Sequence, residues 1–559
     1  MTTSASPACA ARGPSSNGAG RDDSGHSIVS KAAGIFGGMA GVGDMLRRNA
    51  QVSGNKLGLV FEDTRLTWHE VNARCCRFAN ALRGLGVKRG DRVGIFARNS
   101  HQWVEATFAL AKLGAVTVTV NNRLSPPEVA YILNNAGATA LIVARPELAA
   151  ARQALAEVPG CTLLIGIETG DAALIDYEAL VAAGSDAEPE LDRPLAHDEP
   201  SMLLYTSGTT GFPKGATYTH GSTLVGMFVH VHAIGSRSTH RVMLPSPLYS
   251  AAGTAGIYCA VYVGSTSVIV NFDAEKALET LARERITFTN LVPTTIQRLL
   301  AREDFHQYDL SALDTLLYGG SPIPVPVLQD ARRKLPRVRF RQTFASTETG
   351  TAGTVLEPAD HELALQDPAY AHRLLSCGKP QVAVEVAVFD DAGQPVPAGT
   401  VGEIGVRTEA NIAGFWNNPE ATAENIRDGW VYTGDMARID ADGYVYLVDR
   451  KKDLIVTGAF NVYPSEVERV LQQHPAIYEV AVIGVPSVEW GEAIKAVAVL
   501  RPGMQVAAAE LIQWCDGRIA GYKKPKSVDF VATLPRNATG KVLHRQLREP
   551  YWKNEARKI

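Results

Sequence analysis

An eleven-residue segment, Tyr205-Thr-Ser-Gly-Thr-Thr-Gly-Phe-Pro-Lys-Gly215, constrains this chain more than any other stretch. It holds three glycines, four threonine or serine hydroxyls and one lysine, and it follows an apolar run, 202–205, that predicts a buried strand. Glycines let backbone N–H groups turn toward an anion, hydroxyls donate to phosphate oxygens, and lysine adds positive charge. It is not a Walker loop, because no Gly-Lys-Ser/Thr follows at the required spacing. Taken alone, the segment is compatible with a phosphate-binding loop and with a plain surface turn.

Composition narrows the class of protein. The 559 residues are 46% apolar and 20% charged, which is typical of globular proteins, and the formal net charge is −3. That charge provides no basic field for nucleic acid or for an anionic membrane. The seven scattered cysteines form no Cys-x-x-Cys pair, which argues against a metal or disulfide framework and fits a reducing cytoplasm. No apolar run reaches the ~18 residues of a membrane span, so we expect a cytoplasmic protein without a transmembrane segment or a nucleic-acid partner.

The first 45 residues differ from the rest of the chain. They are rich in Ala, Ser and Gly and show little periodic apolar content, so we expect a disordered tail at 1–45. A transit peptide is the alternative, and Asp22 and Asp23 argue against it.

Beyond the tail, predicted strands alternate with predicted helices. The early strands are expected at 57–62, 91–96, 115–120 and 140–143. One intervening helix opens on a capping box formed by Thr67 and Glu70, and the next is expected to be capped by Asn99. Such alternation predicts an α/β fold with parallel-rich sheets and right-handed crossovers, in which ligands gather at the carboxyl ends of strands.

The pattern changes twice toward the C-terminus. After Cys377, alternation rich in Val, Thr and Gly predicts antiparallel strands and hence a β-rich subdomain. Near residue 450 a helix opening at Pro464, a strand at 480–485 and a helix at 507–519 predict a small α+β unit. We therefore expect a large N-terminal domain at 46–449 and a smaller C-terminal domain at 450–559.

Four further polar clusters stand at expected strand ends or turns. They are Thr347-Glu348, Tyr432-Thr-Gly-Asp435, Asp449-Arg-Lys-Lys-Asp453 and Pro535-Arg-Asn-Ala-Thr-Gly-Lys541. Each alone is compatible with a solvated turn or an exposed linker. Together with the glycine-rich segment, and in this order, they resemble the adenylate-forming superfamily, which includes acyl-CoA synthetases, insect luciferases and the adenylation domains of peptide synthetases. The resemblance runs from about residue 45 to about residue 550.

The resemblance implies a two-step reaction. A carboxylate attacks the α-phosphorus of ATP, which gives an acyl-adenylate and pyrophosphate, and the thiol of coenzyme A then displaces AMP. The implied cofactors are ATP, Mg²⁺ and coenzyme A. The protein mainly positions the reactants and offsets charge. The resemblance also implies that the C-terminal domain is mobile about a hinge at 450–453.

The resemblance also assigns roles residue by residue. The β- and γ-phosphates are expected on Thr206, Ser207, Gly208, Thr209, Thr210 and Lys214. Mg²⁺, which favours carboxylate and phosphate oxygens, is expected on Glu348 and Thr206, with Thr347 near the α-phosphate. Adenine is expected beside Gly319, Gly320 and Ser321, and the ribose hydroxyls on Asp435 with Arg450 nearby. Lys541 is expected to bridge the developing charge between carboxylate and α-phosphate, Lys452 to act as the hinge, and Gly458 to approach the pantetheine arm.

Two departures from the family pattern concern the acyl pocket. Tyr249-Ser250 stands where many relatives have an aromatic residue followed by His, and Phe344-Ala-Ser precedes the Thr347-Glu348 pair. Neutral drift and a reshaped pocket both remain open. The small residues Ser250, Ala251, Ala252 and Gly253 would allow a wide cavity for a ring-bearing or bulky apolar acid, although a fatty acid is equally compatible.

The main functional hypothesis is an AMP-forming carboxylate–CoA ligase acting on an apolar acid. The alternative is an acyl-AMP ligase that loads a carrier protein. Segment 247–253 lacks the aspartate expected of an amino-acid-activating domain, and 449–464 shows no evident insertion of the kind found in fatty-acyl-AMP ligases. A luciferase-like oxygenase is supported only by the adenylation half that it would share.

Overall fold

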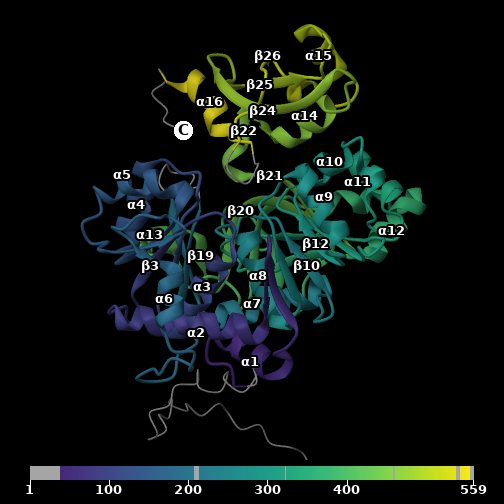
Figure 1. The fold of residues 1–559 in the computed structure, drawn as a ribbon. Coiled ribbons are helices and arrows are strands. Elements are labelled where there is room, and N and C mark those ends of the chain that lie inside the picture. Colours follow the sequence, from purple (N-terminus) through teal and green to yellow (C-terminus); the bar gives the residue numbers. More distant parts are fainter. Residues whose placement is uncertain (1–37, 207–212, 322, 458–459, 537–541, 554–559) are drawn as a thin grey trace, which may run out of the picture. The chain divides into compact units, whose positions relative to one another are not determined.

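The computed structural model describes residues 38–206, 213–321, 323–457, 460–536 and 542–553. Within these ranges the strands form four sheets, drawn as arrows in Figure 1. None of the described helices is both long enough and apolar enough to cross a bilayer.

The first sheet has seven strands and carries the start of the glycine-rich segment. Its order is β7-β6-β5-β3-β4-β8-β9, and all neighbours are parallel except β8 and β9. The strands are β3 (Arg92–Phe96), β4 (Val116–Thr119), β5 (Ala140–Ala144), β6 (Leu163–Ile167), β7 (Ile175–Asp176), β8 (Pro200–Thr206) and β9 (Lys214–Thr219). The expected parallel-rich architecture is therefore confirmed here.

The second sheet has nine strands in the order β16-β15-β14-β13-β12-β10-β11-β1-β2. The strands are β1 (Leu57–Phe61), β2 (Thr64–Thr67), β10 (Arg241–Leu244), β11 (Thr266–Ile269), β12 (Phe288–Leu291), β13 (Thr315–Gly319), β14 (Arg339–Ala345), β15 (Gly353–Leu356) and β16 (Lys379–Pro380). The six strands from β14 to β1 are mutually parallel, so the carboxyl ends of β13 and β14 lie at the same edge of the sheet.

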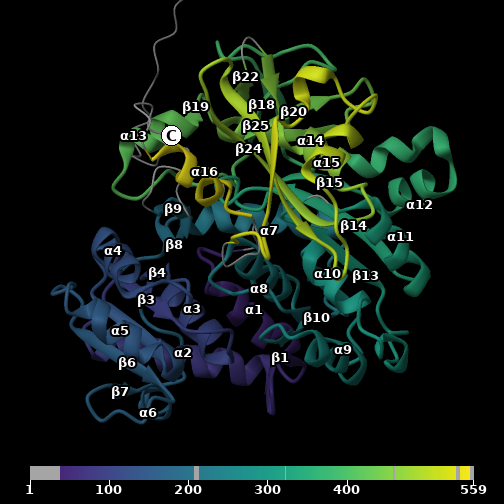
Figure 2. The same ribbon diagram turned by 90° about the horizontal axis from the view of Figure 1, so that it is seen from above.

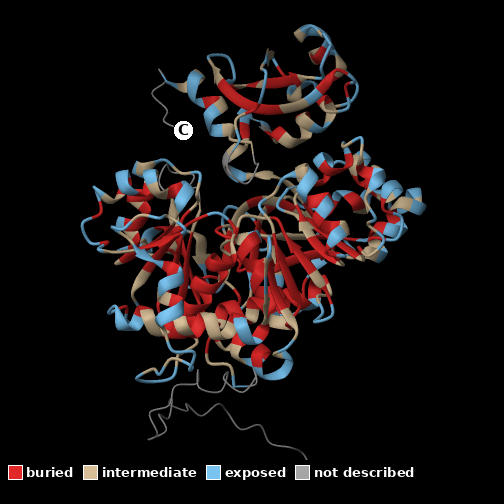
Figure 3. Ribbon diagram, viewed as in Figure 1, coloured by how far each residue is buried: buried red, intermediate tan, exposed pale blue. Residues whose placement is uncertain are grey.

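Buried helices pack between these two sheets. Helix α3 (His101–Leu113) contacts β1 of the nine-stranded sheet and β3 and β4 of the seven-stranded sheet, and every one of its residues is buried. Helices α7 (His220–Ile234) and α8 (Ala251–Val263) pack against each other, with α7 on β9 and α8 on β10 and β11. Figure 3 shows the consequence, since buried positions dominate these inner strands and helices while exposed positions lie on the outer helices.

Of the two predicted helix caps, one is confirmed and one is wrong. The capping box of Thr67 and Glu70 opens helix α2 (Trp68–Gly84) as expected. The prediction that Asn99 caps the next helix is wrong, because Ser100 accepts the hydrogen bond from the N–H of Trp103. The Asn99 side chain instead bonds to the carbonyl oxygens of Ser246 and Val270, each at 3.0 Å, so it joins two distant loops.

The C-terminal part contains the two remaining sheets. The first is antiparallel, as expected after Cys377, and consists of β17 (Glu385–Phe389), β18 (Gly402–Arg407), β19 (Ile426–Arg427), β20 (Trp430–Ile439) and β21 (Val445–Arg450). The second consists of β22 (Ile455–Thr457), β23 (Phe460–Val462), β24 (Ile477–Ser487), β25 (Gly491–Leu500) and β26 (Ser527–Phe530). Helices α14 (Pro464–Leu471), α15 (Ala508–Trp514) and α16 (His544–Trp552) accompany this last sheet, as the labels in Figure 2 show. Its own buried cluster, which includes Val467, Leu471 and Ile494, is what an α+β unit with a separate core requires.

Candidate active site

Both flanks of the glycine-rich segment are held in an antiparallel pair. Thr206, the last residue of β8, lies opposite Lys214, the first residue of β9. Both side chains are partly exposed, and the Lys214 ammonium lies 5.5 Å from the centre of the Phe415 ring. The expected phosphate ligands Ser207, Gly208, Thr209 and Thr210 lie outside the described residues. The two ends of the segment are therefore positioned by strands, which is what a loop that holds an anion needs.

A short segment, 412–416, fastens β9 to the loop that contains Glu348. Its Ala413 and Trp416 N–H groups donate to the carbonyl oxygens of Thr217 and Gly215, at 2.9 and 2.8 Å. At its other end the N–H of Ile412 donates to the carbonyl oxygen of Glu348 at 3.1 Å. One extended segment thus links the glycine-rich region of the seven-stranded sheet to the Thr347-Glu348 pair.

The Thr347-Glu348 pair follows β14 and is also reached from β9 by a side chain. The Tyr218 hydroxyl donates to the carbonyl oxygen of Thr347 at 2.6 Å. Burial raises the pKa of Tyr218 well above its usual value, and the negative charge of Glu348 raises it further. The Tyr218 phenol therefore stays protonated and remains a hydrogen-bond donor. The partly exposed Glu348 carboxylate is close enough for its charge to act on that phenol.

Strand β13, whose end is the place where the adenine is expected, stops beside the same loop. Gly319 ends β13 opposite Thr343 of β14, and a Cβ atom at Gly319 would lie 2.5 Å from the Thr343 carbonyl oxygen. Gly320 has a φ of +79°, in the left-handed region that favours glycine, and both Gly320 and Ser321 are exposed. Behind them, the hydroxyl of Tyr318 bonds to Nε2 of His361 at 2.7 Å. Gly319 and Gly320 therefore leave two successive positions of this edge without side chains, above the anchored Tyr318, which permits a flat ring to lie there.

Asp435 and Arg450 form a pair in the antiparallel sheet. They are opposite residues of β20 and β21, and Arg450 Nε lies 2.6 Å from Asp435 Oδ1. Asp435 is only 8% exposed, so the ion pair compensates a carboxylate that is largely removed from water. The structure brings these two predicted residues together, in a different sheet from Gly319 and from the strand β14 that precedes Thr347.

The predicted hinge follows directly on β21. Lys452 lies in a short 3-10 helix, Lys451–Asp453, and its side chain is outside what the structure describes. The neighbouring Asp449 accepts the N–H of Ser465 at 2.8 Å, and burial raises the pKa of Asp449 to about 6. The predicted residues Gly458 and Lys541 also lie outside the described ranges.

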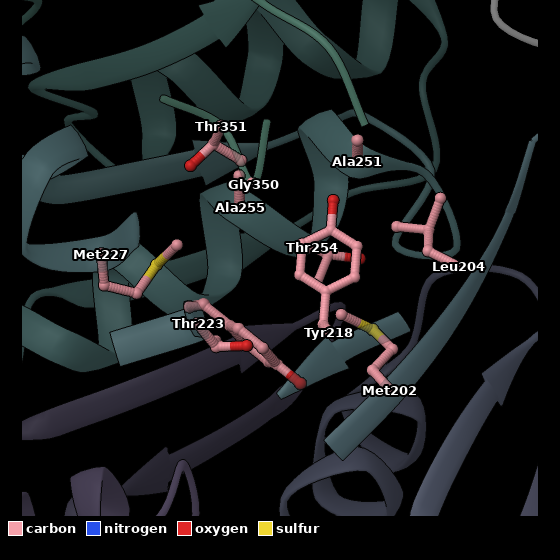
Figure 4. Close-up of a pocket in the computed structure, with 11 residues that line it drawn as sticks. Met202, Leu204, Tyr218, Thr223, Met227, Ala251, Thr254, Ala255, Gly350 and Thr351 are labelled. Carbon is pink, nitrogen blue, oxygen red and sulfur yellow. The ribbon is translucent and has the colours of Figure 1, made fainter. Parts of the chain in front are cut away.

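An apolar pocket lies beside Tyr218. The 11 residues that line it carry no charged side chain, and Figure 4 shows them as sticks. Its wall includes Met202 and Leu204 of β8, Met227 of α7 and Ala255 of α8. Because Tyr218 also lines this pocket, one side chain belongs to both the pocket wall and the Thr347-Glu348 loop.

The small residues at 250–253 have different roles from one another. Ala251 lines the pocket as expected. Ser250 caps α8, since its Oγ accepts the N–H of Gly253, and Ala252 is exposed. Gly253 is required by the backbone, because a Cβ atom there would lie 2.0 Å from the Pro247 carbonyl oxygen. The predicted widening of the pocket therefore rests on one of these four residues.

Comparison with known proteins identifies the family. The family model described as "AMP-binding enzyme" matches residues 46–416, and that described as "AMP-binding enzyme C-terminal domain" matches residues 466–541. The chain belongs to the AMP-binding enzyme family. The resemblance to adenylate-forming enzymes that the motifs suggested is thereby confirmed.

Two relatives and one solved structure show how far the likeness of this AMP-binding enzyme extends. A feruloyl-CoA synthase of Amycolatopsis sp is 37% identical over 514 residues, which is 91% of this chain and 99% of the relative. The long-chain-fatty-acid–CoA ligase FadD13 of Mycobacterium tuberculosis is 35% identical over 519 residues, covering 92% of this chain and 99% of the relative. The crystal structure of the anthranilate CoA ligase AuaEII in complex with anthranoyl-AMP superposes with a TM-score of 0.82 at 30% identity, covering 91% of this chain and 97% of that one.

Sequence reasoning missed Tyr218 and the 412–416 segment of this AMP-binding enzyme. Tyr218 stands only three residues beyond Gly215, but nothing local indicates that its hydroxyl reaches a residue 129 positions away. The apolar run Ile412-Ala-Gly-Phe-Trp416 was a usable signal, because it sits between polar turns and can form an extended segment.

Proposed function

We propose that this AMP-binding enzyme is an ATP-dependent, AMP-forming carboxylate–CoA ligase that activates an apolar carboxylic acid. In the first step a carboxylate oxygen attacks the α-phosphorus of ATP, the bond to the bridging oxygen breaks, and pyrophosphate leaves. In the second step the thiol of coenzyme A attacks the acyl carbon and AMP leaves. Activation is needed because a carboxylate oxygen is a poor leaving group, whereas AMP departs readily.

The proposal rests on the position of Tyr218, which belongs both to the pocket wall and to the contact with the Thr347-Glu348 loop. Its ring lines the uncharged pocket, while its hydroxyl holds the backbone at Thr347, beside Glu348 and on the same strand as Lys214. An apolar acid in the pocket would thus have its carboxylate next to the region proposed for the phosphates. Holding two reactants in contact in this way supplies much of the catalysis in such reactions.

The nucleotide roles follow from this placement. Thr206, Ser207, Gly208, Thr209, Thr210 and Lys214 would hold the β- and γ-phosphates. Gly319, Gly320 and Ser321 would flank the adenine, where bare backbone leaves room for stacking. Asp435, with Arg450 beside it, would accept the ribose hydroxyls, and Thr347 would face the α-phosphate.

Glu348 and Thr206 are the residues proposed to hold Mg²⁺. A partly exposed carboxylate and a threonine hydroxyl at the edge of the phosphate region supply the oxygen donors that this hard cation prefers. When bound, Mg²⁺ would neutralise phosphate charge during the transfer.

The C-terminal roles rest on the family resemblance. The N-terminal domain would span 46–449 and the C-terminal domain 450–559, with Lys452 in a hinge at 450–453. Lys541 would bridge carboxylate and α-phosphate in the first step. Rotation about the hinge would then withdraw Lys541 and bring Gly458 toward the pantetheine arm.

The named relatives leave the class of acid open, because feruloyl-CoA synthase and anthranilate CoA ligase are named for ring-bearing acids, whereas FadD13 is named for long-chain fatty acids. A direct experiment measures AMP and pyrophosphate release over fatty acids, benzoates, cinnamates and bicyclic aromatic acids, with and without coenzyme A. Coenzyme A-dependent turnover on one class is the expected result. Acid-dependent pyrophosphate release with a stalled adenylate would replace this proposal with a ligase that loads a carrier protein.

A further inference from the structure

Helix α4 (Pro126–Ala136), labelled in Figure 1, contacts the first residue of the glycine-rich segment. Asn135 stands in the last turn of this helix, and its Oδ1 accepts a hydrogen bond from the Tyr205 hydroxyl at 2.7 Å. Burial raises the pKa of the Tyr205 phenol, so the hydroxyl stays protonated and remains a donor. The helix therefore holds the residue at which the glycine-rich segment begins.

The same asparagine receives a second hydrogen bond on its backbone. Asn417 Nδ2 donates to the Asn135 carbonyl oxygen at 3.0 Å. That carbonyl is one of the last four of α4, which lack an N–H partner within the helix. Asn417 has a φ of +51°, a left-handed conformation that asparagine adopts more readily than most residues. Asn417 directly follows Trp416, whose N–H donates to the Gly215 carbonyl oxygen, so α4 is also tied to the residue that ends the glycine-rich segment.

The two residues that α4 reaches in this way are themselves neighbours. Tyr205 and Gly215 are opposite residues of the β8–β9 pair, and a Cβ atom at Gly215 would lie 3.0 Å from Tyr205 Cζ. The next pair toward the loop is Thr206 and Lys214, both proposed to hold phosphates. Both strand ends that carry the loop are therefore connected to Asn135, β8 by its side chain and β9 through the 412–416 segment.

Helix α4 is itself firmly fixed. A capping box of Ser125 and Glu128 opens it, and Gly137, with a φ of +63°, follows its last residue. The Tyr205 ring packs against the same core cluster as the buried face of the helix. The residues of that face are Val129, Ala130, Ile132, Leu133 and Ala136.

We propose that Asn135 is a positioning residue that holds the glycine-rich segment in the arrangement that binds the β- and γ-phosphates of ATP. The inference rests on the proposed ligase function. A loop whose ends are held in place loses less conformational entropy when it closes around an anion than a loop with free ends. AMP lacks the two phosphates, so the contribution of Asn135 should appear in the binding of ATP and not in that of AMP.

The test measures the Kd of the full chain for ATP with Mg²⁺ and for AMP, by isothermal titration calorimetry without acid or coenzyme A. The variants are Asn135→Ala, Tyr205→Phe and the double variant. Asn417→Gly removes the second hydrogen bond and still allows the left-handed backbone. The matched control is Asn134→Ala, at the preceding residue of α4, whose exposed side chain donates to the Glu157 carbonyl oxygen at 2.9 Å.

We expect Asn135→Ala and Tyr205→Phe each to raise the Kd for ATP by about three- to tenfold, as the loss of one hydrogen bond would, and to leave the Kd for AMP unchanged. The double variant should bind ATP no more weakly than either single variant, because both changes remove the same bond. Asn417→Gly should also weaken the binding of ATP alone. Asn134→Ala should leave both constants unchanged.

Wild-type affinity for ATP in Asn135→Ala and Tyr205→Phe would overturn the proposal. Equal weakening of ATP and AMP binding would also overturn it, because a general structural defect affects both nucleotides. Additive losses in the double variant would show that the two side chains act separately, against the proposal. If Asn135→Ala does not fold, Tyr205→Phe and Asn417→Gly decide in its place. Acid-dependent pyrophosphate release by the wild type tests the ligase function independently, so these outcomes leave that function intact.

Discussion

The Tyr218 hydroxyl donates a 2.6 Å hydrogen bond to the carbonyl oxygen of Thr347. This bond joins the strand that follows the glycine-rich segment to the loop that carries Glu348. It also ties the acyl pocket to that loop, because the Tyr218 ring lines the pocket. The Tyr218 side chain thus connects the seven-stranded sheet to the loop after β14 of the nine-stranded sheet. We propose that acid and nucleotide react at this place.

Tyr218→Phe should lower kcat by about five- to tenfold, because a buried hydrogen bond is worth about 1 kcal/mol net and its loss frees the Thr347-Glu348 loop. Rates of pyrophosphate release at saturating acid and ATP measure this. The matched control is Tyr177→Phe, which removes the hydroxyl by which Tyr177 of α6 (Tyr177–Ala183) donates to Glu105 of α3 at 3.1 Å. The control should lower the unfolding temperature without changing kcat, and equal kcat losses in both variants would contradict the role assigned to Tyr218.

Asp435→Ala should raise the KM for ATP by at least tenfold, because the proposed ribose acceptor is removed. The specific signature uses 2′-deoxy-ATP. The wild type should discriminate against it by about 1–3 kcal/mol in kcat/KM, whereas Asp435→Ala should treat both nucleotides nearly alike. Asp442→Ala, which changes an exposed carboxylate beyond the end of β20, should keep the wild-type discrimination. If Asp435→Ala still discriminates between ATP and 2′-deoxy-ATP as the wild type does, the ribose does not bind at Asp435.

Lys541→Ala should abolish formation of the adenylate and spare the second half-reaction. The bridging charge is needed only while carboxylate and α-phosphate approach each other. Pyrophosphate release from ATP and acid measures the first step, and thioester formation from supplied acyl-AMP and coenzyme A measures the second in the same preparation. Normal ATP-dependent rates in this variant would remove Lys541 from the mechanism.

Gly350→Ala should destabilise the protein strongly and impair activity. Gly350 has a φ of +61°, and an added Cβ would lie 1.9 Å from the Ala410 carbonyl oxygen. We expect a loss of roughly 3 kcal/mol or more in the free energy of unfolding, since strain and a backbone clash combine. Gly393→Ala is the control, because its φ of +76° is also left-handed but the nearest atom would be 3.9 Å away. It should cost only about 1 kcal/mol, and similar losses in both variants would show that the close approach at Ala410 is unimportant.

Stability should fall on acidification below about pH 6.5. Burial lowers the pKa values of His220, His230 and His361 to about 4, from an ordinary value of 6.5. Between pH 6.5 and 4 the unfolded chain therefore binds protons that the folded chain does not bind. The stability that is present above pH 6.5 is lost across that range. Glu105 acts in the opposite sense, because burial raises its pKa to about 7 and its contribution is lost as the pH rises through that value.

The three histidines outweigh Glu105 between pH 4.5 and 6.5, so we expect a loss of about 1–3 kcal/mol per pH unit there. Thermal unfolding at a series of pH values measures it. His361→Gln should make the dependence shallower by about one proton, since one buried imidazole is removed. A melting temperature that stays constant or rises as the pH falls from 6.5 to 5 would contradict this prediction.

The elements that the sequence predicted well are those whose cause is local. The strand expected at 140–143 is β5, and the capping box of Thr67 and Glu70 opens α2, because a short apolar run and a capping box both act within a few residues. The assignment of a helix cap to Asn99 failed for the opposite reason. Its amide donates to the carbonyl oxygens of Ser246 and Val270, which lie 147 and 171 residues away. The side chain therefore makes tertiary contacts instead of capping the helix that local rules predict.

The sequence by itself determined the family, the order of the motifs and the kinds of residue that each role requires, because these depend on chemistry and spacing along the chain. Only the tertiary structure decided that Tyr218 lines the pocket while its hydroxyl holds the Thr347-Glu348 loop, and that residues 412–416 connect β9 to Glu348. These features depend on the packing of two sheets and of α7 against the loop after β14. Contacts between residues more than a hundred positions apart arise from that packing, and no local pattern encodes them.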